Sequence, residues 1–191
     1  MTDMTPLCYV DTETTGLDPF LHQVFEVAFM REDETEPTTV WLPHQTISAD
    51  PDALNINRYR QRVPDRFQRE AGSFRRNEGF GGQPDALRTV SAALHGVTLV
   101  VANPSFDTMR LHIALGSQPW HQRPIDVETQ AMVVFDWERP PGLRTIADEL
   151  RARGFDIPSP DHSAAGDVLT LAAAYRALRT IRTEQVTGAV L

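Results

Sequence analysis

The amino-acid sequence predicts an α/β fold with a central sheet of about five strands and helices packed against it. Three short β-prone segments follow one another near the start of the chain, which is typical of an antiparallel meander. Strand and helix patterns then alternate, and the last part of the chain is helical. This order of elements favours one sheet that is covered by helices.

The strands are predicted from short apolar runs. The run at residues 97–101, VTLVV, is continuously apolar, which is typical of a buried parallel strand. The first run, residues 7–10, ends directly before Asp11. The predicted strands cover residues 7–10, 24–30, 38–43, 97–101 and 124–127.

The helices are predicted from apolar residues at helical spacing and from their end signals. Asn103 is a good helix N-cap, and Pro104 suits the first helical position. Residues 44–83 are harder to assign, and we expect one or two short helices there within a long functional loop region. The predicted helices run from residue 84 to about 94, from 104 beyond 113, from about 128 to 135, from about 143 to 153, and from about 164 to 182.

Length, charge and cysteine content limit the class of protein. The chain has 191 residues, which favours one domain, and it holds no apolar run long enough for a membrane span. The formal net charge of -8 argues against a broad basic surface for duplex DNA, but not against an acidic site that divalent metal neutralises. The single cysteine and an N-terminal stretch without basic residues predict a cytoplasmic protein with no secretory signal.

Arginine residues are concentrated between Asn57 and Asn77, and aromatic residues lie among them. This combination suits single-stranded nucleic acid, because guanidinium groups pair with phosphates and aromatic rings stack on bases. A solvated loop whose arginine stems cover apolar surface is the alternative, and the stretch alone favours that alternative slightly. We expect a single domain over residues 1–191 with an arginine-rich insert around residues 55–80. The arginines of the stretch are Arg58, Arg60, Arg62, Arg66, Arg69, Arg75 and Arg76.

Two carboxylates, Asp11 and Glu13, lie two positions apart where the first predicted strand ends. Side chains at this spacing leave the same face of a strand. Asp107 follows the strand at 97–101 and falls in the first turn of the next helix. Because ligands bind beyond the carboxyl ends of parallel strands, Asp107 should meet Asp11 and Glu13 if the two strands are parallel neighbours.

The segment DHSAAGD, residues 161–167, adds His162 and Asp167. Along a helix the two would lie about 140° apart, so His162 is expected to reach the same point from the preceding loop. Converging carboxylates repel one another unless divalent cations lie among them, and oxygen ligands favour Mg2+ or Mn2+. Two such ions about 3.5–4 Å apart assist phosphodiester hydrolysis, and a nearby histidine can take the proton of the attacking water.

Each of these residues also has a structural interpretation. Asp11 can cap a strand end, Asp107 can stabilise a helix N-terminus, and His162 can be an ordinary surface residue. The ordered set is harder to explain in this way than any single member.

The ordered set resembles the DEDDh 3′–5′ exonucleases, the DnaQ-like family that includes the proofreading epsilon subunit of bacterial replicative DNA polymerase. VDTETTGLDP, at residues 10–19, is close to the first family motif at nearly every position. NPSFD, at residues 103–107, is similar to the second, and HSAAGD, at residues 162–167, matches the spacing of the third. Ala102 departs from the family pattern, which often has His or Tyr there. The resemblance covers roughly residues 7–180.

The resemblance implies an RNase-H-like fold with a five-stranded mixed sheet flanked by helices. It also implies that four carboxylates bind two divalent metal ions, Mg2+ or Mn2+, with Asp11 shared between them, and that His162 is the general base. The four are Asp11, Glu13, Asp107 and Asp167. The residues that it places against the terminal nucleotide, or that match beside it, are Thr14, Thr15, Gly16, Leu17, Asn103 and Phe106. DPDALNI, at residues 50–56, is similar to a family segment that borders substrate, which adds Arg58 and Arg60 to the expected substrate-binding residues.

The implied activity is metal-dependent hydrolysis of single-stranded nucleic acid from the 3′ end to nucleoside 5′-monophosphates, with DNA favoured over RNA. The implied setting is proofreading or repair, and the expected partners are a single-stranded 3′ end and a DNA polymerase. Two alternatives stay open: a 3′–5′ exoribonuclease that trims RNA, and a catalytically weak nucleic-acid-binding module of a polymerase complex. A binding module that had lost its activity would be marked by loss of a carboxylate, and all four carboxylates are present.

Overall fold

A five-stranded mixed sheet in the order β3-β2-β1-β4-β5 forms the centre of the molecule in the computed structural model, which describes residues 5–64 and 84–188. β1 pairs antiparallel with β2, which pairs antiparallel with β3, whereas β4 and β5 run parallel to β1. The predicted meander and the predicted parallel neighbour of β1 are therefore confirmed. The strands are β1 (Leu7–Thr14), β2 (Val24–Arg31), β3 (Thr38–Trp41), β4 (Thr98–Val101) and β5 (Ile125–Asp126).

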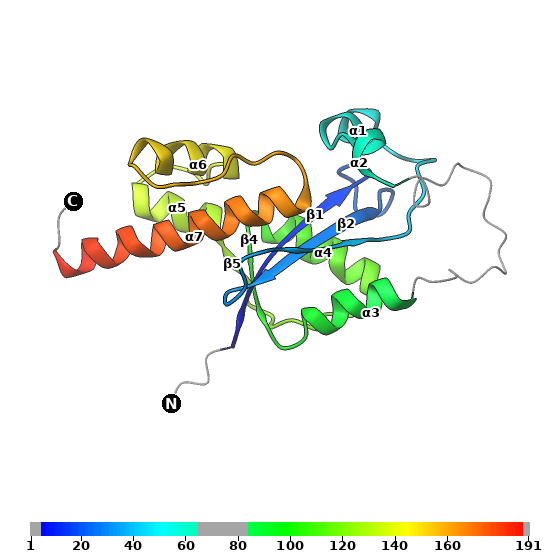
Figure 1. Ribbon diagram of the computed structural model, residues 1–191, viewed down its shortest axis with the longest axis horizontal. Helices are drawn as coiled ribbons and strands as arrows, with labels where there is room; N and C mark the ends of the chain where they lie inside the picture. The colour runs from blue at the N-terminus through cyan, green and yellow to red at the C-terminus, as the bar shows by residue number, and fades with distance from the viewer. Residues whose placement is uncertain (1–4, 65–83, 189–191) are drawn as a thin grey trace.

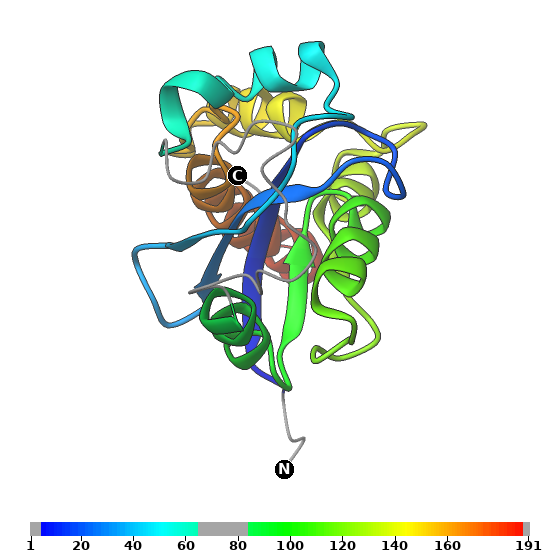
Figure 2. The same cartoon turned by 90° about the vertical axis from the view of Figure 1, so that its right-hand side faces the viewer.

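Helices cover both faces of the sheet. The layer formed by α5, α6 and α7 lies on one face, and α3 and α4 lie on the other (Figure 1, Figure 2). The two short helices α1 and α2 lie beyond the end of β1 (Figure 1). The helices are α1 (Pro51–Ile56), α2 (Tyr59–Arg62), α3 (Pro84–Ala93), α4 (Pro104–Leu115), α5 (Val127–Phe135), α6 (Leu143–Ala152) and α7 (Ala164–Thr187).

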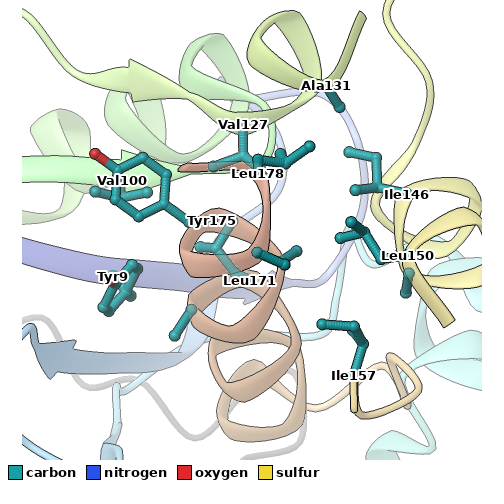
Figure 3. Packing of buried hydrophobic residues seen from close by; sticks show 14 of the residues in the cluster. Tyr9, Val100, Val127, Ala131, Ile146, Leu150, Ile157, Leu171, Tyr175 and Leu178 are labelled. Atoms are coloured by element: carbon teal, nitrogen blue, oxygen red, sulfur yellow. The ribbon is translucent and has the colours of Figure 1, made fainter. Parts of the chain in front are cut away.

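Alternation along β1 divides the core in two. Tyr9 packs with Leu171 and Tyr175 of α7 in the larger cluster, which Figure 3 shows from close by. Cys8 and Val10 face the opposite way, into the cluster under α3 and α4. The same alternation carries past Tyr9, so Asp11 and Glu13 face the α7 layer and Thr12 faces the α4 layer.

β1 is longer than the sequence indicated. The apolar run ends at Val10, but pairing with β2 continues through Asp11 opposite Ala28 and Glu13 opposite Glu26. Pairing with β4 stops at Tyr9 opposite Val100. The last residues of β1 therefore extend beyond β4, which leaves their edge open to the start of α4.

The remaining boundaries differ by a few residues. β5 has two residues and α7 continues to Thr187, beyond the predicted end near residue 182. The short helices predicted after residue 44 are α1 and α2, but the stretch 65–83 lies outside the described residues. The predicted arginines Arg66, Arg69, Arg75 and Arg76 belong to that stretch. Across the two described ranges, 5–64 and 84–188, no helix is both long and apolar enough to cross a membrane.

Candidate active site

Three of the predicted carboxylates converge on the α7 side of the sheet. Asp11 and Glu13 come from β1, and Asp167 comes from the first turn of α7. One ligand oxygen from each lies within 4.8 Å of the others. This cluster follows from the packing of the core. Alternation along β1 directs Asp11 and Glu13 toward α7, and the packing of α7 over β1 directs Asp167 toward them.

Asp107 comes from α4, on the other face of the sheet, and lies near these three carboxylates. Its Oδ1 accepts a 2.7 Å hydrogen bond from the Thr12 hydroxyl, and the residue is buried. Thr12 faces α4, so the bond holds Asp107 against the edge of β1 that β4 leaves open. Burial and then the Asp107 charge raise the pKa of Asp11, so Asp107 is close enough to interact with the three carboxylates on the other side of β1.

The protonation of these groups is strongly altered. Burial, and then the charges of Asp107 and Glu13, raise the pKa of Asp11 well above its usual range. Burial, followed by the Asp167 and Glu26 charges, raises the pKa of Glu13 to about 9. Burial raises the pKa of Asp107 to about 7 against the opposing effect of the Thr12 hydrogen bond, and it also raises the pKa of Asp167. Near neutral pH the cluster therefore binds protons that a cation can displace.

The donor set fits a divalent cation. All of its donors are carboxylate oxygens, which Mg2+ and Mn2+ prefer, and one oxygen from each of three residues lies within 4.8 Å of the others. Asp11, Glu13 and Asp167 are close enough to share one ion. Asp11 and Asp107 are the residues that would hold a second.

His162 comes from the loop before α7, as the helical geometry required. Its backbone has φ 60, in the left-handed region, and its side chain is exposed. Asp167 Oδ1 accepts hydrogen bonds from the amides of Asp161 (2.9 Å) and His162 (3.3 Å), so the ligand and the loop are held together. Gly166 is required here because a Cβ atom at this position would overlap the Asp161 carboxylate.

The turn after β1 places Leu17 at the surface. Leu17 is 72% exposed, whereas Thr14 and Thr15 are buried. The Thr14 hydroxyl donates to the Gly16 carbonyl, and the Thr15 hydroxyl accepts from the Gln23 amide. The two hydroxyls are thus committed to the turn itself, and Leu17 is the side chain that the turn presents to solvent.

Gly16 lies in the turn after β1, where only a residue without a side chain fits. A Cβ atom on Gly16 would overlap the ring of His22. His22 Nδ1 accepts a 2.9 Å hydrogen bond from the Asp18 amide, so this histidine closes the turn.

Phe106 and Leu17 are brought together by Arg110. The Arg110 guanidinium lies 3.5 Å from the centroid of the Phe106 ring, and its Nη2 donates to the Leu17 carbonyl. Its Nη1 donates to the Phe106 carbonyl at 3.1 Å. Asn103 occupies the N-cap position of α4, but its side chain does not cap the helix and accepts from Ser105 Oγ at 2.7 Å. The predicted N-cap position and helix start are therefore confirmed, although the Asn103 side chain makes no capping hydrogen bond.

No family model and no curated protein match this chain. Solved structures do match this chain in fold. Exonuclease X, in complex with 5′ overhanging duplex DNA, is 18% identical, with a TM-score of 0.57, and the match covers 95% of this chain and 93% of that one. The chain has the fold of the DnaQ-like exonucleases. Escherichia coli exonuclease I, in complex with a dA16 oligonucleotide, is 16% identical with a TM-score of 0.64, and the match covers 95% of this chain but 42% of that one.

A third neighbour carries metal. S. pombe Pop2p, in its Mg2+ and Mn2+ bound form, is 14% identical with a TM-score of 0.62, and the match covers 92% of this chain and 83% of that one. The RNase-H-like fold predicted from the three motifs is thereby confirmed.

Arg58 and Arg60 were expected to bind substrate. Arg58 directly precedes α2, and Arg60 lies on it. Arg58 Nη2 donates to the Asp161 carbonyl at 2.8 Å and lies 3.3 Å from its carboxylate, and the pair is about half-exposed. Arg60 is exposed. Arg58 is therefore attached to the loop that carries His162, which is a structural contact that the sequence did not indicate.

Four residues with contacts in the site were not among the predicted ones: Thr12, Arg110, Glu26 and Arg62. Glu26 of β2 lies directly opposite Glu13, is 2% exposed, and forms an ion pair with Arg62. A glutamate in the otherwise apolar run VFEVAFM was a usable signal, because the hairpin register puts it on the face of Glu13. No sequence pattern separated Arg62 from its arginine-rich surroundings.

Proposed function

We propose that this chain is a metal-dependent 3′–5′ exonuclease that hydrolyses single-stranded nucleic acid to nucleoside 5′-monophosphates. The observation that carries the proposal is the convergence of Asp11, Glu13 and Asp167 within 4.8 Å, with His162 bonded to Asp167 through its backbone amide. Buried carboxylates in contact destabilise a folded chain, so a cluster that serves only the fold is unfavourable. Binding of divalent cations would neutralise these carboxylates and would explain why the fold brings them together.

Asp11, Glu13 and Asp167 would hold one metal ion, and Asp11 with Asp107 a second. Bound in this way, the ions would lower the pKa of an attacking water and stabilise negative charge on the scissile phosphate. Asp11 is the shared ligand because it has neighbours in both layers of the fold.

His162 takes the proton from the attacking water through its imidazole. The water oxygen forms a bond to phosphorus, and the bond from phosphorus to the 3′ oxygen of the penultimate nucleotide breaks. That 3′ oxygen takes a proton from solvent, which leaves a shortened strand with a 3′ hydroxyl and a released nucleoside 5′-monophosphate. The exposed loop position of His162 lets its proton pass to bulk water after each turnover.

Leu17 and Phe106 bind the terminal nucleotide. Leu17 is an exposed apolar side chain in the turn after β1, and Arg110 fixes its carbonyl beside Phe106. An aliphatic and an aromatic side chain offer stacking surface that does not discriminate between bases. Arg58 and Arg60 border the bound nucleic-acid strand on the side of α2.

DNA is the substrate class that we favour. Two neighbours of the same fold are described in complex with DNA, one with an overhanging duplex and one with an oligonucleotide. RNA trimming uses the same carboxylate chemistry and is the second candidate. A binding module without activity is disfavoured because all four carboxylates and the histidine are in place.

Substrate class and the need for a free strand end are tested together with matched linear DNA, linear RNA and circular single-stranded DNA. We expect chromatography to show nucleoside 5′-monophosphates from the linear strands, faster from DNA, and none from the circle. Release of products from the circle would replace the proposal with an endonuclease. Faster release from RNA would select the exoribonuclease, and no release from any strand would select the binding module.

The wider setting is also proposed. We infer that residues 1–191 act as a single exonuclease domain in the cytoplasm, where the buried thiol of Cys8 stays reduced. A DNA polymerase is the partner that a proofreading role requires. Co-purification of the two tests that partnership.

A further inference from the structure

Glu26 is a buried carboxylate placed directly beside the candidate metal ligands. It is paired in register with Glu13 across β1 and β2, and both side chains face the α7 layer. Like charges directly opposite each other in an antiparallel pair are destabilising, and both of these glutamates are buried. A neutralising partner for Glu26 is therefore needed before Glu13 can serve as a ligand.

Arg62, at the end of α2, is that partner. Its Nη2 forms an ion pair with Glu26 Oε2, and the two side chains are 16% and 2% exposed. Its Nη1 donates to two carbonyls, that of Asn57 at 2.9 Å and that of His162 at 2.7 Å. One guanidinium thus joins β2, the α1–α2 segment and the loop that carries His162.

Glu26 also lies near the start of α7. Its carboxylate is close enough to Ala164, the first residue of α7, for the Ala164 amide to interact with it. Asp167 lies in the first turn of the same helix. The Arg62–Glu26 pair therefore holds the loop just before α7, through the bond from Arg62 to the His162 carbonyl.

His162 depends on such an anchor. A non-glycine residue with positive φ is strained, and an exposed loop offers little packing to hold it. The Arg62 bond fixes its carbonyl, and the bond from its amide to Asp167 fixes the other side of the same residue. These two bonds fix the backbone from which the imidazole projects, and the imidazole itself has a separate contact, because its Nε2 lies 3.4 Å from Nη2 of Arg144.

We propose that Arg62 is a positioning residue that sets the catalytic orientation of His162 from α2, with Glu26 as its fixed support on the sheet. The inference rests on the proposed exonuclease function. It assigns to α2 a role in catalysis in addition to any contact with substrate. Arg62 acts through His162 and Asp167 and touches neither substrate nor metal.

The test is a double-mutant cycle between Arg62→Met and His162→Ala, with Arg153→Met as the matched control. Arg153 forms an ion pair with Glu149 on α6, away from the site. We expect Arg62→Met alone to lower kcat about 10- to 100-fold, with KM within about threefold of wild type. In the His162→Ala background the same change should lower kcat by less than about threefold. Arg153→Met should leave kcat unchanged.

Multiplicative losses in the double variant, or an unchanged kcat in Arg62→Met, would overturn the inference. If Arg62→Met does not fold, Arg62→Lys replaces it in the cycle. That variant keeps a charge beside Glu26 but has one donor nitrogen for three acceptors, so a partial loss of kcat is expected, and again only when His162 is present. A wild-type protein without activity would contradict the proposed function and not the cycle.

Hydrogen exchange of the metal-free protein gives a readout that does not depend on activity. The amides of Asp161 and His162 are bonded to Asp167 Oδ1. We expect peptides covering residues 158–167 to exchange faster in Arg62→Met than in wild type, while peptides from α6 are unchanged. Equal exchange of residues 158–167 in both proteins would show that Arg62 does not hold this loop.

Discussion

Thr12 donates a 2.7 Å hydrogen bond to Asp107 from the face of β1 opposite to Asp11 and Glu13. One strand therefore directs two candidate metal ligands toward the α7 layer and orients a carboxylate that comes from the α4 layer. The chain can do this because β1 extends past the end of β4, so that the start of α4 reaches its edge. The candidate site lies where the two layers meet.

Replacing Thr12 with Val should lower activity at neutral pH. The Thr12 hydrogen bond holds down the pKa of Asp107, which is already raised to about 7, so its loss raises that pKa further. We expect kcat/KM in Mg2+ to fall about tenfold at pH 7 and to recover toward wild type at pH 9. A pH–rate profile of Thr12→Val beside Thr12→Ser checks this. An equal loss at all pH values in both variants would contradict it.

The metal-free protein should lose stability as pH rises. The folded pKa of Glu13 is about 9 and that of Asp107 about 7, against ordinary values of 4.5 and 3.8. Because the folded state binds these protons more tightly, the stabilisation is complete below the ordinary pKa values and is lost as pH rises through the folded ones. Thermal melts in EDTA should show Tm falling between pH 5.5 and 9.

Mg2+ should reverse this fall, because the cation replaces the lost protons as the neutralising charge. The measurement is the same set of melts with Mg2+ in place of EDTA. A Tm in EDTA that is flat or rising over this range would show that the cluster is not protonated in the folded state.

Glu13→Gln should stabilise the metal-free protein, and it should abolish the activity that the protein has in Mg2+. The amide keeps the shape of the side chain but cannot ionise against Glu26 and Asp167. At pH 8.5 in EDTA we expect Tm to rise by about 5 °C. The surface change Glu138→Gln is the control and should alter neither Tm nor activity. A lower Tm for Glu13→Gln would mean that Glu13 has a structural role.

Arg110→Lys should weaken substrate binding more than catalysis. Lysine keeps a positive charge near Asp107 but cannot stack on Phe106 while donating to both the Leu17 and Phe106 carbonyls. We expect KM for single-stranded DNA to rise roughly tenfold with kcat within about threefold. Arg88→Met removes an exposed ion pair on α3 and is the control. A fall in kcat at constant KM would place Arg110 with the metal ligands instead.

Most of the site was predictable because it follows from two periodicities. Spacing of two on a strand aligned Asp11 with Glu13, and the helical position of Asp167 turned it toward the sheet. The loop position of His162 followed from the same geometry. These inferences needed only local structure and the parallel pairing of β1 with β4.

The rest depends on tertiary contacts that leave no local pattern. Arg62 reaches Glu26 and His162 across 36 and 100 positions of the chain, and its sequence context resembles that of a solvated arginine. The packing of the His22 ring against Gly16 is another contact that the sequence did not indicate. The length of β1 was underestimated because its last residues are polar, and pairing with β2 rather than hydrophobicity keeps them in the strand.

The central claim is that the Asp11 cluster hydrolyses nucleic acid with divalent metal. Its most direct test is digestion of 5′-labelled single-stranded DNA by wild type and by Asp11→Asn, each in Mg2+, Mn2+ and EDTA, with circular dichroism to show that both are folded. We predict a ladder that shortens from the 3′ end with wild type in either metal, and none with Asp11→Asn or in EDTA. An equal ladder from folded Asp11→Asn, or one that persists in EDTA, would contradict the claim.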